Sequence, residues 1–348
     1  MKKVIYAMLS VCVAAVCIVL GSCSTGDSAA GAAAKLLGGS SEALLFLNCR
    51  AVSEDEIEFE FSRPVTIKSL VFEPVLGIDS IEEGSTVKVR INEIQKPGTG
   101  ITAEILAEDQ DKNSINVLVP FRTRNNRMPK LVINEICTEY YNAKAGKKEE
   151  YIEFKTKSAG NLGAMRVIIN GNANAVKQTI YEFSPVEVKK DEYVVLHLRT
   201  FDRSSRDEYT DNLNVSGGVN ASSEARDFWI PGETKLIHTP ASAVYVLDQD
   251  DKALAAVMFS SDLSSWWAKD YLAETAEFLF KQGAWKSVDG KICGPAGAVN
   301  SAGATNSRTI CRDETIEENS KTAAEWYITA TSSATPGKPN NSKRYVPK

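Results

Sequence analysis

Strict alternation of apolar and polar residues after position 43 is the feature that most constrains the fold of this chain. Ile57, Phe59 and Phe61 alternate with glutamates, and the same spacing recurs at residues 87–91 and 115–119. A period of two puts alternate side chains on opposite faces of a sheet, so these runs predict half-buried antiparallel strands. Turn-forming residues separate the runs, at positions 63–64, 83–84, 96–98 and 109–113. About seven short strands between residues 43 and 125 therefore predict a small β-sandwich.

The first 23 residues have the pattern of an export signal. Lys2 and Lys3 precede an almost wholly apolar run at residues 4–20, and small residues then lead to Cys23. The sequence Leu20-Gly21-Ser22-Cys23 resembles a bacterial lipoprotein lipobox. The resemblance implies a lipid on Cys23, which would tie the chain to a membrane of the bacterial cell envelope, the outer membrane or surface rather than the inner membrane. An uncleaved anchor and an ordinary signal peptide are the alternatives.

Residues 24–42 are rich in Ser, Gly and Ala, which predicts a flexible tether because such a segment buries too little apolar area to fold. The net charge of the chain is −5. Nucleic acid is therefore not expected as a partner, since phosphate binding needs clustered basic residues. The cluster of Arg122, Arg124, Arg127 and Lys130 is interpreted as a solvated linker.

Several ordered motifs in residues 128–340 suggest a second domain. Ile-Asn-Glu-Ile at 133–136 contains Asn134 and Glu135, and Tyr-Ile-Glu-Phe at 151–154 contains Glu153. Strand-like runs follow at 193–196 and 244–248, and after Trp326 comes Thr-Pro-Gly-Lys-Pro-Asn at 335–340, with Pro336, Gly337 and Asn340. This set resembles the lamin-tail domain, and residues 53–65 resemble the start of a bacterial Ig-like module. Together they imply a mainly β chain of two consecutive Ig-like β-sandwiches.

The second domain is longer than a minimal domain of that kind. The excess lies largely in the polar loops at 201–229 and 290–312 and in a helix expected over residues 264–285, capped by Ser264 or Ser265 and ended by Gly283. Residues 341–348 are expected to form a polar tail.

Groups able to do chemistry are few. Glu135 and Glu153 could act as paired carboxylates, but their strand positions favour a structural role, with Glu135 bonding to a neighbouring turn. His197 and His238 are the two histidines, and neither belongs to a recognised catalytic motif. Acidic stretches at 109–111 and 248–251 are interpreted as hairpin turns rather than calcium sites. The sequence therefore predicts no enzyme, no metal site and no cofactor.

Cysteine and tryptophan leave two questions open. Cys293 and Cys311 bracket a small-residue loop and are candidates for a disulfide in an exported protein, while Cys49 and Cys137 are expected to be buried thiols. Core packing is expected for Trp229, Trp267 and Trp285. Trp266 is the exception, because its neighbour takes the apolar helix face, and it is a candidate ligand contact.

Together these features predict a lipid-anchored, non-catalytic binding or scaffolding protein of the cell envelope, with a protein or glycan ligand. The alternative is an envelope hydrolase with its site in the long loops of the second domain. A histidine in a deep pocket beside a carboxylate would favour that alternative.

Overall fold

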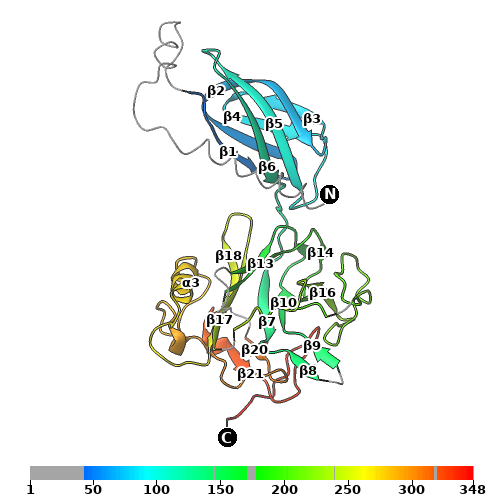
Figure 1. The fold of residues 1–348 in the computed structure, drawn as a ribbon, viewed down its shortest axis with the longest axis vertical. Helices are drawn as coiled ribbons and strands as arrows, with labels where there is room; N and C mark the ends of the chain where they lie inside the picture. The colour runs from blue at the N-terminus through cyan, green and yellow to red at the C-terminus, as the bar shows by residue number, and fades with distance from the viewer. Residues whose placement is uncertain are drawn as a thin grey trace, which may run out of the picture. The chain divides into compact units, whose positions relative to one another are not determined.

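The computed structural model describes residues 43–143, 146–170, 178–201, 203–238, 240–316 and 320–347. The predicted signal peptide, Cys23 and the predicted tether at 24–42 lie outside these residues. The described chain is mainly β and divides into two compact units (Figure 1). Unit 1 contains residues 43–50, Glu58–Arg90 and Thr102–Pro120, and unit 2 contains Ala51–Ile57, Ile91–Ile101 and Phe121 onward.

One six-stranded sheet is built from β1 (Phe46–Ala51), β2 (Glu56–Glu73), β3 (Ile78–Glu82), β4 (Gly84–Ile91), β5 (Gly100–Asp109) and β6 (Ser114–Arg122). The order is β3-β4-β2-β5-β6, and β1 also pairs with β2. The predicted alternation is confirmed, since Phe59, Val89 and Ile105 are among the buried residues and their chain neighbours face outward more.

The turn predicted at Arg63-Pro64 is wrong, because β2 runs straight through it for 18 residues. Before this point the strand lies beside β1, where Ser62 N donates to Leu45 O at 2.9 Å, and after it Val65 pairs with Asp109 of β5. Proline has no N–H to donate, so it is tolerated where a strand changes partner. Six strands therefore replace the seven expected.

Two sheets, of six and five strands, form the body of unit 2. The first has the order β16-β15-β10-β7-β20-β21, with β7 (Leu131–Cys137) and β10 (Tyr151–Thr156) at its centre. The second has the order β13-β12-β17-β18-β19. The remaining bounds of the two sheets are β12 (Arg166–Asn170), β13 (Thr179–Glu182), β15 (Tyr193–His197), β16 (Ala225–Trp229), β17 (Ala241–Leu247), β18 (Ala253–Ser260), β19 (Val299–Asn300), β20 (Ile310–Arg312) and β21 (Trp326–Ile328).

Short elements complete unit 2. Two-stranded sheets pair β8 (Tyr141–Ala143) with β9 (Gly146–Lys148) and β11 (Gly160–Asn161) with β14 (Glu187–Val188). Single 3-10 turns occur at Pro295–Gly297 and Ala323–Glu325. β16, which the sequence did not reveal, adds to β15 in parallel.

Side chains of both large sheets share one core. Ile136, Phe154 and Leu196 of the first sheet belong to the same buried cluster as Val244 and Val257 of the second. The single helix among the described residues, α3 (Asp270–Lys281), adds Leu272, Ala276 and Leu279 to this cluster. Sheets that bury one face each against a common core form a two-layer arrangement.

The helix is shorter than the predicted span of 264–285. It begins after Lys269, because the Ser264 hydroxyl bonds to Asp262 and to Trp266 O instead of capping a helix. Gly283 ends it as expected, with a φ of +62°.

The outer face of the first sheet is also buried. All residues of β7, β15 and β16 are inaccessible, although every second one points away from the shared core. The 203–224 loop and the chain after Thr329 cover this face through hydrogen bonds described below. The predicted polar tail does not hang free over residues 341–347, since Tyr345 N donates to Ile328 O at 2.8 Å and Arg344 pairs with Asp313 at 2.7 Å.

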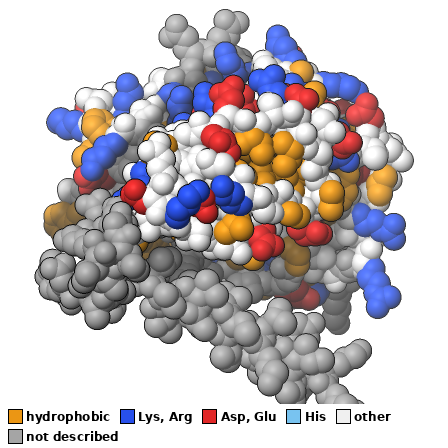
Figure 2. Space-filling view, turned by 90° about the horizontal axis from the view of Figure 1, so that it is seen from above, with side chains coloured by type: hydrophobic (Ala, Val, Ile, Leu, Met, Phe, Trp, Pro, Cys, Tyr) orange, Lys and Arg blue, Asp and Glu red, His pale blue; other side chains and the backbone are white. Residues whose placement is uncertain are grey.

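Figure 2 shows one face of the molecule, on which basic and acidic side chains are interspersed around a compact hydrophobic patch. No large area of a single charge sign appears on this face, in keeping with the modest net charge of −5. Within the described residues, no helix has both the length and the apolar character needed to cross a membrane.

Candidate functional site

Glu135 of β7 and Glu153 of β10 lie directly opposite each other on the outer face of the first sheet. Both are fully buried. Glu135 accepts hydrogen bonds from Thr309 Oγ1 at 2.5 Å and from the backbone N–H of Thr335 at 3.1 Å. Glu153 accepts from Asn134 Nδ2 at 2.8 Å and from the Gly337 N–H at 2.6 Å. The two carboxylates therefore hold the Thr-Pro-Gly segment against the sheet.

Asn340 completes this attachment. Its Nδ2 donates to Asn134 O at 3.0 Å and to Arg312 O at 2.9 Å, and its backbone N–H donates to Glu314 Oε2 at 3.0 Å. The predicted motif residues Asn134, Glu135, Glu153, Gly337 and Asn340 are thus brought together across about 200 positions of sequence. The arrangement gives the motif a structural role and matches the expectation that Glu135 bonds to a neighbouring turn.

Burial shapes the protonation of this pair. Desolvation raises the pKa of Glu153 well above its usual range, and the charge of Glu135 raises it further. The pKa of Glu135 is also raised by burial, against the opposing effect of the bonds from Thr309 and Thr335. Two carboxylates so close in a buried site favour holding a proton between them.

His197 of β15 lies on the same outer face, between two carboxylates. Nε2 is 2.8 Å from Asp227 Oδ1, and Nδ1 is 3.1 Å from Glu149 Oε1. The ring is fully buried and stacks on Trp229 with 3.8 Å between ring centroids. Burial by itself lowers the pKa of His197, but the bonds and charges of Asp227 and Glu149 outweigh it and raise that pKa above its usual value.

Both carboxylates beside His197 also bind the long polar loop. Asp227 Oδ2 accepts from the Ser222 N–H at 3.0 Å, and Glu149 accepts from the Asn220 N–H at 3.3 Å. Glu208, a buried residue of the loop itself, accepts from the N–H groups of Val215 and Ser216 at 3.1 and 3.0 Å and, through Oε2, from the Asp227 N–H of β16 at 3.0 Å. His197 and these acids therefore fasten the 203–224 loop to the sheet.

The candidate disulfide between Cys293 and Cys311 is not formed, since both thiols are free. Cys293 belongs to the core shared by the two sheets. Cys311 pairs with Glu135 across β20 and β7 and so points to the outer face, where Thr309 Oγ1 is 3.4 Å from its sulfur. The first sheet separates the two sulfurs, which excludes a bond. Burial raises the pKa of Cys293 to about 11 and that of Cys311 still further.

The tryptophans divide as expected. Trp229, Trp267 and Trp285 are buried. Trp266, the candidate ligand contact, is 76% exposed in the segment before α3. The acidic turns also match their interpretation, since Asp109 Oδ1 and Asp248 Oδ1 each accept two backbone N–H bonds within the β5–β6 and β17–β18 hairpins.

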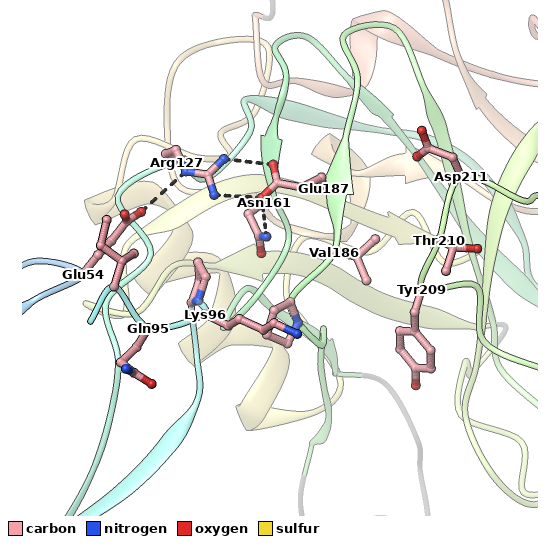
Figure 3. Close-up of a pocket in the computed structure, with 13 residues that line it drawn as sticks. Glu54, Gln95, Lys96, Arg127, Asn161, Val186, Glu187, Tyr209, Thr210 and Asp211 are labelled. Carbon is pink, nitrogen blue, oxygen red and sulfur yellow. Dashed lines mark hydrogen bonds and ion pairs between the residues drawn. The ribbon is translucent and has the colours of Figure 1, made fainter. Parts of the chain in front are cut away.

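An open pocket of about 340 Å³ lies in unit 2, away from these buried clusters (Figure 3). We call it the Arg127 pocket. Six segments of the chain line it, with the residues Glu54, Ile94, Gln95, Lys96, Pro97, Arg127, Asn161, Pro185, Val186, Glu187, Tyr209, Thr210 and Asp211. None of these had been singled out individually as a site from the sequence, although Tyr209, Thr210 and Asp211 belong to the 201–229 loop considered for the alternative hydrolase, and Arg127 belongs to the basic cluster interpreted as a linker.

Tight packing fixes one wall of the Arg127 pocket. Gly98 follows Pro97 with a φ of +74°, and its N–H donates to Thr123 O at 3.0 Å. A Cβ on Gly98 would lie 3.0 Å from the backbone nitrogen of Ala164, so only glycine lets this loop approach so closely. The loop that carries Lys96 is thereby held against the segment that carries Asn161.

Charged groups of the Arg127 pocket are largely paired with one another. Arg127 makes two bonds to Glu187, at 2.8 and 2.9 Å, and its Nε is 3.5 Å from Glu54. Glu187 also accepts from Asn161 Nδ2 at 2.8 Å (Figure 3). The Arg127 guanidinium lowers the pKa of Glu187 below its usual range, so this carboxyl stays ionised. The pocket thus offers fixed hydrogen-bonding groups with little unbalanced charge.

The other two arginines of the basic cluster are paired too. Arg122 is 2.8 Å from Glu182 and Arg124 is 2.6 Å from Asp250. The side chains of Arg122 and Arg127 are more than half exposed, as a solvated segment requires, and each arginine also pairs with a carboxylate of unit 2. Local sequence shows the basic residues but not acids 60 or 126 positions away.

Comparisons with known proteins identify a family for most of the second domain. The family model described as TP_1001 protein second domain matches residues 129–328. A protein of Treponema pallidum (strain Nichols), described as uncharacterized, is 28% identical over 206 residues, which are 56% of this chain and 50% of that protein. The chain thus matches about half of the length of this relative.

Among solved structures, a DUF4876 family protein from Bacteroides thetaiotaomicron VPI-5482 aligns with 84% of this chain and 93% of its own, at 12% identity and a TM-score of 0.27. The family match covers more than half of the 348 residues, including β7, β10 and both buried clusters up to β21. The chain belongs to the TP_1001 second-domain family.

Proposed function

We propose that this protein is a lipid-anchored, non-catalytic binding or scaffolding protein of the bacterial cell envelope, and that the Arg127 pocket is its ligand site. In this proposal unit 1 is an Ig-like β-sandwich and unit 2 an enlarged lamin-tail-like sandwich. The lipid on Cys23 holds both at the membrane, and an outer-membrane or surface position is preferred. The ligand is a protein or a glycan.

One contrast carries the proposal. The buried groups capable of acid–base chemistry, Glu135, Glu153 and His197, are all engaged in fastening loops to the first sheet. The Arg127 pocket instead presents ordered polar side chains to solvent around a cavity of about 340 Å³. A rigid β scaffold that exposes loop residues around a preformed pocket is the usual arrangement of a binding module.

An envelope hydrolase with its site in the long loops is the alternative. His197 does lie beside a carboxylate, as such a site requires. Its ring is fully buried, however, and it does not line the Arg127 pocket. A general base must come within hydrogen-bond reach of its substrate, so this geometry favours the binding role.

Two experiments on the full chain in cells test the proposal. The first compares the parent with Cys23→Ser after feeding an alkyne-labelled fatty acid; label and membrane association in the parent alone support the anchor. Label in both proteins, or in neither, overturns it. The second places a photo-crosslinking amino acid at Lys96 in the Arg127 pocket, with Lys286, which is also exposed, as control site. Products specific to position 96 support a binding role, and their absence refutes it.

A further inference from the structure

We infer that the Arg127 pocket binds an uncharged oligosaccharide through stacking on Tyr209 and hydrogen bonds to the Arg127–Glu187–Asn161 network. This inference rests on the proposed function and narrows its ligand class.

Tyr209 provides the aromatic surface. Its side chain is 55% exposed at one side of the Arg127 pocket (Figure 3). The hydroxyl donates to Asp207 Oδ2 at 2.7 Å, and the ring packs edge to face on Phe228, with 6.2 Å between ring centroids. Asp207 is itself held by the Trp229 N–H at 2.8 Å. An exposed ring that is already held in place can stack on a ligand with little loss of side-chain entropy.

Hydrogen-bonding groups on the other side of the pocket are equally fixed. Glu187 holds both Arg127 and Asn161, and Asn161 Oδ1 already accepts from the Gly163 N–H at 2.8 Å, so the groups left in set directions are the remaining N–H donors and the Glu187 carboxylate. Figure 3 shows the Lys96 side chain extending from its loop toward the side that Tyr209 lines. Planar amide, carboxylate and guanidinium groups in a fixed network suit a ligand with several hydroxyls at its edge.

Ion pairing of Arg127 and Asp211 favours a neutral ligand over a strongly ionic one. Arg127 is neutralised by Glu187 and Glu54, and Asp211 lies 3.2 Å from Lys189 and 3.7 Å from Arg226. A phosphate or a polyamine would have to break these pairs to be bound. A neutral ligand can bind without breaking these ion pairs.

Apolar side chains complete the match. Ile94, which is 74% exposed, and the half-buried Pro185 add aliphatic surface between the polar groups, and Pro97 and Val186 lie buried beneath it. A pyranose ring has the same division, with C–H groups on its faces and hydroxyls around its edge. Few other uncharged ligands need both an aromatic surface to stack on and hydrogen-bonding groups around it.

Calorimetric titration of the full chain, purified in a detergent that contains no sugar, tests this inference. The probes are neutral gluco-, manno- and chito-oligosaccharides of three or four sugars. At least one should bind with a Kd of about 1 mM or tighter. Tyr209→Ala should weaken that binding about tenfold, whereas Tyr209→Phe should keep it within about threefold, because the ring is retained.

Controls separate binding from folding. Tyr141→Ala removes a tyrosine of similar exposure, 43%, outside the pocket and should leave affinity unchanged. Ile94→Asp changes an exposed pocket side chain without touching the core and should abolish binding even if Tyr209→Ala unfolds. Saturation by none of the probes at about 10 mM overturns the inference, and so does equal binding by the Ile94→Asp protein.

These outcomes are distinct from failure of the proposed function. Cross-linking of a protein from position 96 together with no saccharide binding overturns the glycan assignment and keeps the binding role. Absence of both removes the binding role as well.

Discussion

Replacing His197 by glutamine should destabilise the protein strongly at acidic pH and weakly at alkaline pH. In the parent, the imidazolium lies between Asp227 and Glu149, whose side chains are 1% and 2% exposed. Glutamine has a comparable shape and can donate one hydrogen bond, but it carries no charge. Two buried carboxylates would then face each other without a cation between them.

The magnitude follows from the burial of all three groups. Breaking a buried ion pair by removing one partner costs about 3–5 kcal/mol. One retained hydrogen bond returns about 1 kcal/mol, so a net loss of about 2–4 kcal/mol is expected. That is a large part of the roughly 5–15 kcal/mol by which folded domains are stable.

The pH dependence has a definite sign. Because the pKa of His197 is raised in the folded state, its contribution is complete below the unfolded value of about 6.5 and is lost as the pH rises through the folded pKa. Within that window the parent loses about 1.4 kcal/mol of stability per pH unit from this group. The glutamine variant lacks this slope, so the difference between the two proteins narrows at alkaline pH.

Urea unfolding at about pH 5.5 and about pH 9 measures both effects. His238→Gln is the matched control, because His238 is only partly buried and its pKa is lowered by burial, Lys235 and Lys269. It should change stability by less than about 0.5 kcal/mol. Equal free energies of unfolding for the parent and His197→Gln at the acidic pH would refute this account of His197.

Three further outcomes follow from the same structure. Glu153→Gln keeps an acceptor for the Gly337 N–H but does not titrate. As the pH rises through the raised pKa of Glu153, the melting temperature of the variant should therefore fall less than that of the parent. Melting temperatures that fall equally with pH in both proteins would contradict this. Gly337→Ala should lower the free energy of unfolding in urea by about 1–3 kcal/mol, because φ is +78° and the new Cβ would clash with Ser222 Oγ. Gly290→Ala should cost clearly less, because its φ is similar, +80°, but a Cβ there would meet no other atom. When the protein is unfolded without reductant, Cys293 and Cys311 should both react with a thiol reagent. If neither reacts, the two cysteines are joined by a disulfide after all.

Periodicity predicted the strands of unit 1 well, because alternate residues there face either the core or water. It failed at Pro64, where the change of partner strand depends on β1 and β5 rather than on local sequence. It also failed for β16, whose Arg226 and Asp227 look like loop residues. These charges are buried only because Glu192 and His197, distant in sequence, pair with them.

The candidate sites show the same division. The motif glutamates were placed correctly in a structural role. Trp266 is exposed as expected, but the reason given fails, because Trp266 and Trp267 precede α3 and do not lie on its faces. The Arg127 pocket was missed, because Arg127, Asn161, Glu187 and Tyr209 come from four separate segments with no common spacing. The disulfide was predicted wrongly, since loop composition does not tell which side of a sheet each cysteine faces.

Attachment of residues 335–340 to the centre of the first sheet limits the order in which this domain can fold. Gly337 meets Glu153 across 184 positions, and Asn340 meets Asn134 across 206. Without residues 335–340, β7 and β10 lack the cover over their buried carboxylates. Contacts so distant in sequence carry a high loop-closure cost, so we expect the docking of residues 335–340 to be a late step of folding. Chains in which these residues are undocked should be cut by proteases more readily than the native protein.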